Sequence, residues 1–236
     1  MLGLIDCLSL WRKIDELDDQ SVSSRRKVGN AQSRIIVFLP WNVSIETAEA
    51  LRLLPNSYFA CNETPDGIVS STPEVPVQCL AEAEKVFVQD LATIRKSGRD
   101  PLLIGLSMGN FAATYLANKY HLDLISVASG HSGDWLTFNS PASRHLRLKA
   151  EAAGLQEADF VARLHSISPV NNLCSLGAAS QFIFGNFDHY IPQYSRDALI
   201  AELRQNRPDI PIVKVPFGHV VTILLWKFLA HDYRDG

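Results

Sequence analysis

A serine bracketed by glycines is the first feature of the sequence that could do chemistry. Gly105-Leu106-Ser107-Met108-Gly109 has the pattern G-x-S-x-G, between a short apolar run at 102–104 and a helical pattern at 108–120. Between a strand and a helix, this pattern makes a sharp turn that exposes the serine hydroxyl, and the small flanking residues let backbone and helix approach closely. The alternative interpretation is a helix start with Ser107 as a simple N-cap, since serine is a favoured cap residue.

A nucleophilic serine needs a histidine base, and the histidine needs a carboxylate that orients it. Asp188 and His219 each follow a predicted strand, so the chain order is serine, acid, histidine. Asp134, shortly after another predicted strand, is the alternative acid. We favour Asp188 because it lies in a Gly-x-x-Asp turn that ends at Pro192, which places a short side chain on a stiff loop.

No other group of residues has the spacing of a metal or cofactor site. His189 stands beside Asp188 and is predicted to be a surface or rim residue. The remaining histidines show no matching carboxylate or metal-ligand spacing, and the chain contains no G-x-G-x-x-G motif. We therefore expect no metal and no cofactor.

The elements that must position these residues alternate between strand and helix. Continuous apolar, β-branched runs are typical of strands that are buried on both faces of a parallel sheet. Six strands are predicted, at 35–39, 57–61, 102–104, 124–128, 181–184 and 210–215, and Pro211 indicates that the last is an edge strand. Helices are predicted at 45–54, 77–96, 108–120, 142–153, 157–164, 194–205 and 221–231. This alternation predicts an α/β fold with a mostly parallel sheet, whose ligands bind at the carboxyl ends of the strands.

From Arg34 to the C-terminus, the sequence resembles the α/β-hydrolase family, which carries nucleophile, acid and histidine in this order on strand ends. The resemblance implies a serine hydrolase with Ser107, Asp188 and His219 as its catalytic triad. In the family, the first strand is normally followed by His-Gly, which shapes the oxyanion hole, whereas here Pro40-Trp41-Asn42 follows. Larger members also have two strands before this point, and none is expected here. We expect the oxyanion to be bound by the backbone N–H groups of Met108 and Trp41, with Asn42 as the alternative to Trp41.

The chain divides into an N-terminal segment, 1–33, and a hydrolase domain, 34–236. The first segment is predicted to hold an amphipathic helix and a polar linker, because apolar residues recur at helical spacing: Leu4, Leu8, Trp11, Ile14 and Leu17. This helix is a candidate contact with the domain, with a second copy in a homodimer, or with another partner. The irregular stretch at about 131–175 is predicted to form a small helical lid.

Composition excludes several other classes of protein. Among the 236 residues, 22 Lys and Arg stand against 25 Asp and Glu, so the net charge is −3 and no basic excess indicates a nucleic-acid partner. No stretch reaches the roughly 20 apolar residues of a membrane span. No basic region precedes the apolar N-terminus as in a secretory signal, and the four cysteines have no C-x-x-C spacing, so a cytoplasmic location is expected.

These observations predict an enzyme that hydrolyses small carboxylic esters or thioesters through an acyl-enzyme intermediate. An acyltransferase or an amidase with the same triad is an alternative, as is a ligand-binding protein without catalysis, because a fold does not fix its chemistry.

Overall fold

The structure is a computed structural model of the chain, and it describes residues 18–132, 134–140 and 143–230, without the side chains of 134–136. The apolar residues of the predicted N-terminal helix, Leu4 to Leu17, lie outside the described residues. The contact predicted for this helix, with a partner or a second copy, therefore stays a prediction. The division of the chain at residue 34 therefore stays a prediction.

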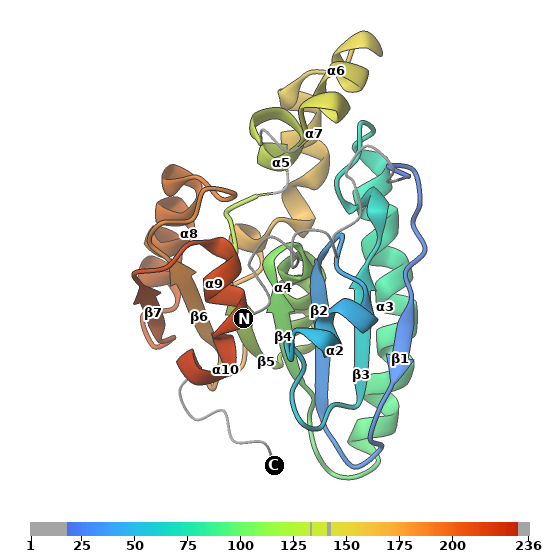
Figure 1. Cartoon of the computed structure of the whole chain (residues 1–236), viewed down its shortest axis with the longest axis vertical. Coiled ribbons are helices and arrows are strands. Elements are labelled where there is room, and N and C mark those ends of the chain that lie inside the picture. Colours follow the sequence, from blue (N-terminus) through green and yellow to red (C-terminus); the bar gives the residue numbers. More distant parts are fainter. Residues whose placement is uncertain (1–17, 133, 141–142, 231–236) are drawn as a thin grey trace.

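One sheet of seven strands forms the centre of the molecule (Figure 1). The strand order is β1-β3-β2-β4-β5-β6-β7, with β1 antiparallel to β3 and every other neighbouring pair parallel. The strands are β1 (Arg26–Val28), β2 (Ile35–Trp41), β3 (Ala60–Thr64), β4 (Leu102–Leu106), β5 (Asp123–Val127), β6 (Gln181–Gly185) and β7 (Ile212–Val215). The predicted mostly parallel sheet is confirmed, and β7 lies at an edge as Pro211 indicated.

The first strand, β1, corrects the prediction that no strand precedes Arg34. Its sequence Arg-Lys-Val lacks the apolar run that identified the other six strands, and Val28 is exposed. Ion pairs hold the strand in place, from Arg26 to Asp90 and from Lys27 to Glu49. Charged side chains suit an edge strand because they discourage pairing with another chain, so part of the predicted linker is an edge of the sheet.

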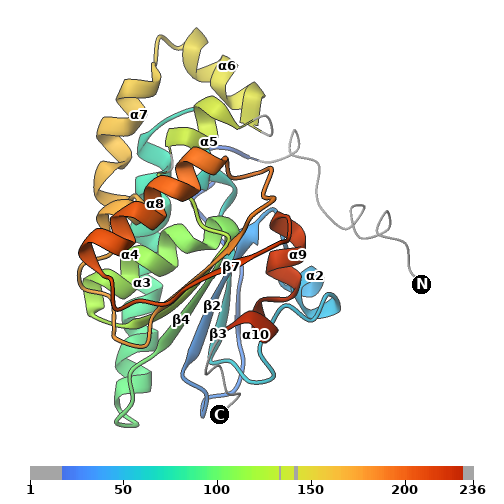
Figure 2. The same cartoon turned by 90° about the vertical axis from the view of Figure 1, so that its left-hand side faces the viewer.

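Helices cover both faces of the sheet. Alternate residues of each strand point to opposite sides, and since the strands are apolar at both sets of positions, each face has a core to bury. In β2, Ile36 and Phe38 belong to the core on one face, while Ile35, Val37 and Leu39 belong to the core on the other. The first face is covered by α3 (Glu74–Arg95), α4 (Asn110–Tyr120) and α8 (Gln193–Asn206). The second face is covered by α2 (Ile45–Ala50), α9 (His219–Leu224) and α10 (Trp226–Leu229), and Figure 2 shows the two layers.

A group of three helices lies beyond the carboxyl ends of the strands, at the top of Figure 1. These are α5 (Asp134–Asn139), α6 (Arg144–Ala152) and α7 (Glu157–Leu164), with short 3-10 turns η5 (His165–Ile167) and η6 (Pro169–Asn171) after them. The predicted helices at 142–153 and 157–164 are present, whereas α5 is too short for its periodicity to be read. The position above the strand ends is what a lid requires, and the lid role stays a prediction.

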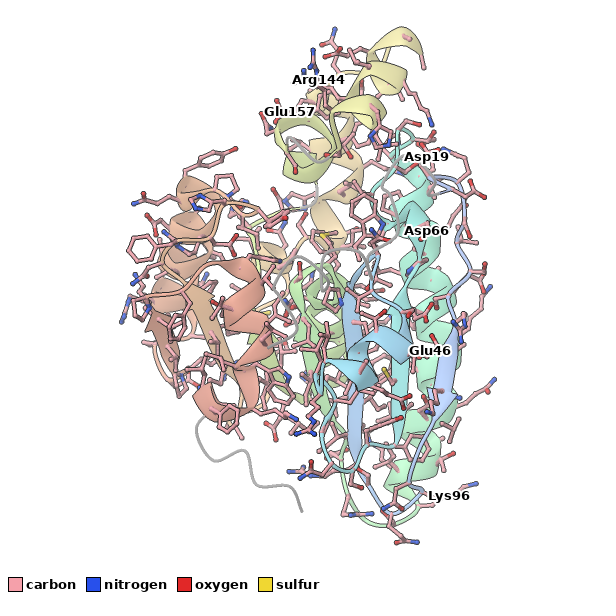
Figure 3. The ribbon with its side chains drawn as sticks, in the orientation of Figure 1. Asp19, Glu46, Asp66, Lys96, Arg144 and Glu157 are labelled. Atoms are coloured by element: carbon pink, nitrogen blue, oxygen red, sulfur yellow. The ribbon has the colours of Figure 1, made fainter. Side chains whose placement is uncertain are left out.

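The start of the described chain is attached to this group of helices. The Asp19 carboxylate accepts hydrogen bonds from the Ser71 hydroxyl at 2.6 Å and from the Lys149 ammonium group at 3.3 Å. Figure 3 shows Asp19 close to the group of three helices α5, α6 and α7, and Lys96 at the other end of the molecule. The segment before β1 therefore runs along the same end of the molecule as the strand ends where ligands are expected.

The fully buried Trp226 fixes α10 against the sheet, and its Nε1–H donates to the carbonyl of Leu53 at 2.8 Å. We expect Trp226→Ala to lower the free energy of unfolding by about 3–5 kcal/mol, because it removes a large buried side chain and leaves a cavity. Phe228, two residues later and 84% exposed, is the control, and Phe228→Ala should change stability by less than about 0.5 kcal/mol. Urea unfolding measures both, and equal losses would contradict this packing.

Candidate active site

The turn at Ser107 has the strained geometry that its sequence pattern predicts. Ser107 directly follows Leu106, the last residue of β4, and opens η3 (Ser107–Gly109), with a φ of 51°. This left-handed conformation costs a non-glycine residue about 1–2 kcal/mol. A Cβ on Gly109 would stand 2.2 Å from the carbonyl oxygen of Phe38, so the start of the helix touches the backbone of β2. The close approach leaves no space for a side chain and holds the strained turn in place.

His219 reaches the Ser107 hydroxyl from a different part of the chain. It is the first residue of α9, after β7 and the N-cap Gly218. Its Nε2 lies 2.7 Å from Ser107 Oγ, which is hydrogen-bond distance. The histidine is buried, with 8% of its surface exposed, so the pair is shielded from most of the solvent.

Asp188 completes the hydrogen-bonded chain from the loop after β6. Its Oδ2 lies 2.6 Å from His219 Nδ1, and its Oδ1 accepts the backbone N–H groups of Tyr190 and Ile191 at 2.9 Å each. Because a carboxylate only accepts hydrogen bonds, Nδ1 carries the proton and Nε2 of the neutral ring is left to accept the Ser107 hydroxyl. The arrangement therefore holds the imidazole in the tautomer that a general base requires.

The loop that carries Asp188 is braced by Arg196, which the sequence analysis did not identify. The buried guanidinium donates from Nη1 to the carbonyl oxygens of Gly185 and Asn186, at 2.7 and 3.1 Å. These are the last residue of β6 and the residue after it. An arginine in a helical pattern normally indicates a solvent-facing position, so the sequence held no signal for this role.

Tyr190 was also missed, and it covers one side of the histidine. The two ring centroids are 5.2 Å apart with the planes tilted by 47°, and about half of Tyr190 is exposed. The exposed part of this ring leaves an apolar surface beside the imidazole.

The predicted oxyanion donors lie beside the same turn. Met108 is the middle residue of η3, and Trp41 is the last residue of β2, whose backbone the glycine turn touches. Trp41 is held in place by its indole Nε1–H, which donates to the carbonyl of Asp66 at 3.2 Å. Asn42 follows with a φ of 64°, so the chain turns sharply after the strand. The binding of an oxyanion by these backbone groups stays a prediction.

The remaining candidates lie apart from the hydrogen-bonded chain or beyond the described side chains. Asp134 is the first residue of α5, and its side chain is outside the described part. His189 is exposed, as predicted. Burial raises the pKa of the Cys61 and Cys79 thiols to about 12, so neither forms a competing thiolate nucleophile at neutral pH.

The described residues contain neither a cluster of metal-ligating side chains nor a membrane-spanning helix. Among them, no three His, Cys, Asp or Glu side chains gather as a metal would require. Within the same residues, no helix has the length and apolar character needed to cross a membrane.

No model of a known protein family and no curated protein matches the sequence. Solved structures do match the fold. The capsule O-acetyltransferase of Neisseria meningitidis serogroup A aligns with a TM-score of 0.59 at 16% identity, over 87% of each chain. A structure from a study of the carboxylesterases of the archaeon Nitrososphaera gargenis aligns with a TM-score of 0.52 at 15% identity, over 88% of this chain and 93% of the other. TT1662 from Thermus thermophilus also aligns with a TM-score of 0.52, at 16% identity, over 87% of this chain and 90% of the other.

These likenesses show the fold, and at such low identity they show nothing finer. The chain has the α/β-hydrolase fold, as the sequence motifs predicted.

The turn at Ser107 depends on Gly109 for space and not for backbone freedom, because the residue has ordinary right-handed dihedrals, with a φ of −58°. We expect Gly109→Ala to destabilise the protein by about 3 kcal/mol or more, since the added methyl group collides with backbone that cannot rotate away. Gly98→Ala is the control, since Gly98 has a φ of 74° but open space around it, and should cost about 1 kcal/mol. Urea unfolding of both variants tests this, and a Gly109→Ala protein as stable as wild type would contradict the close approach.

Proposed function

We propose that the protein is a serine hydrolase that cleaves carboxylic esters or thioesters, with Ser107 as nucleophile, His219 as general base and Asp188 as orienting acid. The observation that carries the proposal is the continuous hydrogen-bonded chain from Ser107 Oγ through both ring nitrogens of His219 to Asp188, with links of 2.7 and 2.6 Å. In the proposed roles, the nucleophile, the base and the group that orients the base are therefore in direct contact.

The reaction has two halves. Ser107 Oγ attacks the acyl carbon as His219 Nε2 takes the hydroxyl proton, and the carbonyl oxygen becomes an oxyanion. When the tetrahedral intermediate collapses, the bond to the leaving alcohol or thiol breaks and Nε2 gives its proton to that group. Water then attacks the acyl-serine with His219 again as base, and the carboxylic acid and free Ser107 are released.

The oxyanion is proposed to accept hydrogen bonds from the N–H groups of Met108 and Trp41, or of Asn42 in place of Trp41. Each such donor is worth about 3 kcal/mol of barrier when it points at the developing charge. The N-terminus of α4, which follows η3 directly, adds a positive potential at the same place.

Acyl transfer to an acceptor other than water is the second candidate. The aligned meningococcal protein is named as an O-acetyltransferase, while the Nitrososphaera structure comes from a study of carboxylesterases. Both activities use the same first half-reaction, so the identity of the acceptor decides between them. A protein that only bound its ligand would have no use for a base held at hydrogen-bond distance from a strained serine.

The catalytic assignment is tested by a pair of histidine variants together with the serine variant. We expect Ser107→Ala and His219→Ala to lower kcat for p-nitrophenyl acetate by about 10⁴-fold or more, because each removes a group that takes part in bond making or proton transfer. His189→Ala, whose side chain is exposed next to Asp188, should keep wild-type turnover. Circular dichroism confirms folding of each variant. A folded Ser107→Ala protein that keeps more than a few per cent of kcat would refute the proposal.

The identity of the acid is tested separately. Asp188→Asn should lower kcat by about 10⁴-fold, because the amide favours the wrong imidazole tautomer. Asp134→Asn should lower kcat by less than about tenfold if Asp188 alone accepts the hydrogen bond from His219 Nδ1–H. Steady-state kinetics of both folded variants decide the question. A greater loss in Asp134→Asn would assign the acid to Asp134 and leave Ser107 and His219 in their roles.

A further inference from the structure

A buried asparagine next to the serine turn has no part in the proposed chemistry. Asn110 is the first residue of α4, and its side chain is fully shielded from solvent. The two hydrogens of its amide nitrogen are both used, because Nδ2 donates to the carbonyl oxygen of Ser107 at 2.9 Å and to that of Val127 at 2.7 Å. One side chain therefore links the turn after β4 to the end of β5.

Both linked carbonyls lie next to residues with strained backbone dihedrals. Ser107 has a φ of 51°, and Ala128, directly after Val127, has a φ of 54°. Both are non-glycine residues in the left-handed region, at the ends of neighbouring strands whose last paired residues are Leu106 and Val127. Such conformations persist only where the surroundings hold them, and the Asn110 amide binds the carbonyl of Ser107 and the carbonyl of Val127, which is part of the peptide group that leads into Ala128.

The amide oxygen of Asn110 adds no hydrogen bond of its own. Within the described part of the chain, no donor reaches Asn110 Oδ1, although the atom is buried. Leaving a buried acceptor unpaired is unfavourable, so what the side chain contributes here is the pair of hydrogen bonds that its Nδ2 donates. Gly105 also makes room for this side chain, since a Cβ there would stand 2.6 Å from Oδ1. The first glycine of the motif thus accommodates the amide.

We propose that Asn110 is a positioning residue, which holds the backbone of Ser107 so that Oγ stays within hydrogen-bond distance of His219 Nε2. This inference rests on the proposed function, because it assigns a role relative to a nucleophilic serine. Without the amide, the carbonyls of Ser107 and Val127 lose their shared donor and the turn relaxes toward ordinary dihedrals. The Oγ then leaves the attack geometry, and an error of about 1 Å in such a position can cost 10²-fold in rate.

The chain offers a matched control on the same helix. Thr114 lies one turn after Asn110 and is equally buried, and its hydroxyl finds no partner among the described residues. Thr114→Val removes a buried polar atom of α4 without touching the serine turn. Asn110→Ser is the conservative variant, because a serine hydroxyl in a helix can donate to the carbonyl three residues earlier. It can therefore keep the link to Ser107 and lose the link to Val127.

The experiment measures the second-order rate constant for labelling of Ser107 by a fluorophosphonate, per folded molecule, together with kcat and KM for p-nitrophenyl acetate. We expect Asn110→Ala to slow labelling and kcat by about 10- to 100-fold with little change in KM, and Asn110→Ser to fall between it and wild type. Thr114→Val should stay within about twofold of wild type. A purely structural role would lower the melting temperature and leave the rate per folded molecule unchanged.

Two results would overturn the proposal, and they are distinguishable. If wild-type protein is not labelled at Ser107 at all, the proposed function fails and the positioning role fails with it. If wild type is labelled and folded Asn110→Ala reacts at the wild-type rate, the positioning role is wrong while the proposed function stands. Should Asn110→Ala not fold, Asn110→Leu is measured instead, because leucine has nearly the same shape and donates no hydrogen bond, and labelling of its folded form at the wild-type rate would refute the positioning role.

Discussion

The close approach of the helix start at Gly109 to the backbone of β2 is the constraint on which the candidate site depends. A Cβ on Gly109 would stand 2.2 Å from the carbonyl oxygen of Phe38, so no side chain fits at that position. The chain can make this contact only by reversing within one residue after β4, and Ser107 takes the resulting left-handed conformation. Its hydroxyl therefore lies at the carboxyl ends of the strands, where the loops after β6 and β7 begin.

Asp188 and His219 are held in place by several hydrogen bonds within the protein. Asp188 receives two backbone N–H groups and the imidazole, so its carboxylate cannot rotate without breaking several hydrogen bonds. The loops that carry Asp188 and His219 are tied to each other, because the N–H of Phe187 donates to the carbonyl of Phe217 at 3.0 Å. In the proposed reaction, such preorganisation lowers the cost of moving charge, since few groups have to reorient.

The sequence predicted the parts of the fold that depend on local patterns. Mainly apolar runs, some as short as the one at 102–104, identified six strands, and the residues that follow three of them meet in the structure as Ser107, Asp188 and His219. The strand β1 was missed because an edge strand needs no apolar run. Arg196 and Asn110 were missed for another reason. A polar residue in a helical pattern is read as solvent-facing, and only tertiary packing shows that these two bind backbone carbonyls inside the protein.

The central claim is that Ser107 forms a covalent acyl intermediate. Rapid acid quenching during turnover of p-nitrophenyl acetate, followed by peptide mapping with mass spectrometry, tests it most directly. We predict an acetyl group on the peptide that contains Ser107, localised to that serine, whose amount rises within the first turnover. Continued release of p-nitrophenol with no acetyl group on Ser107, or with the acetyl group on another residue, would contradict the claim.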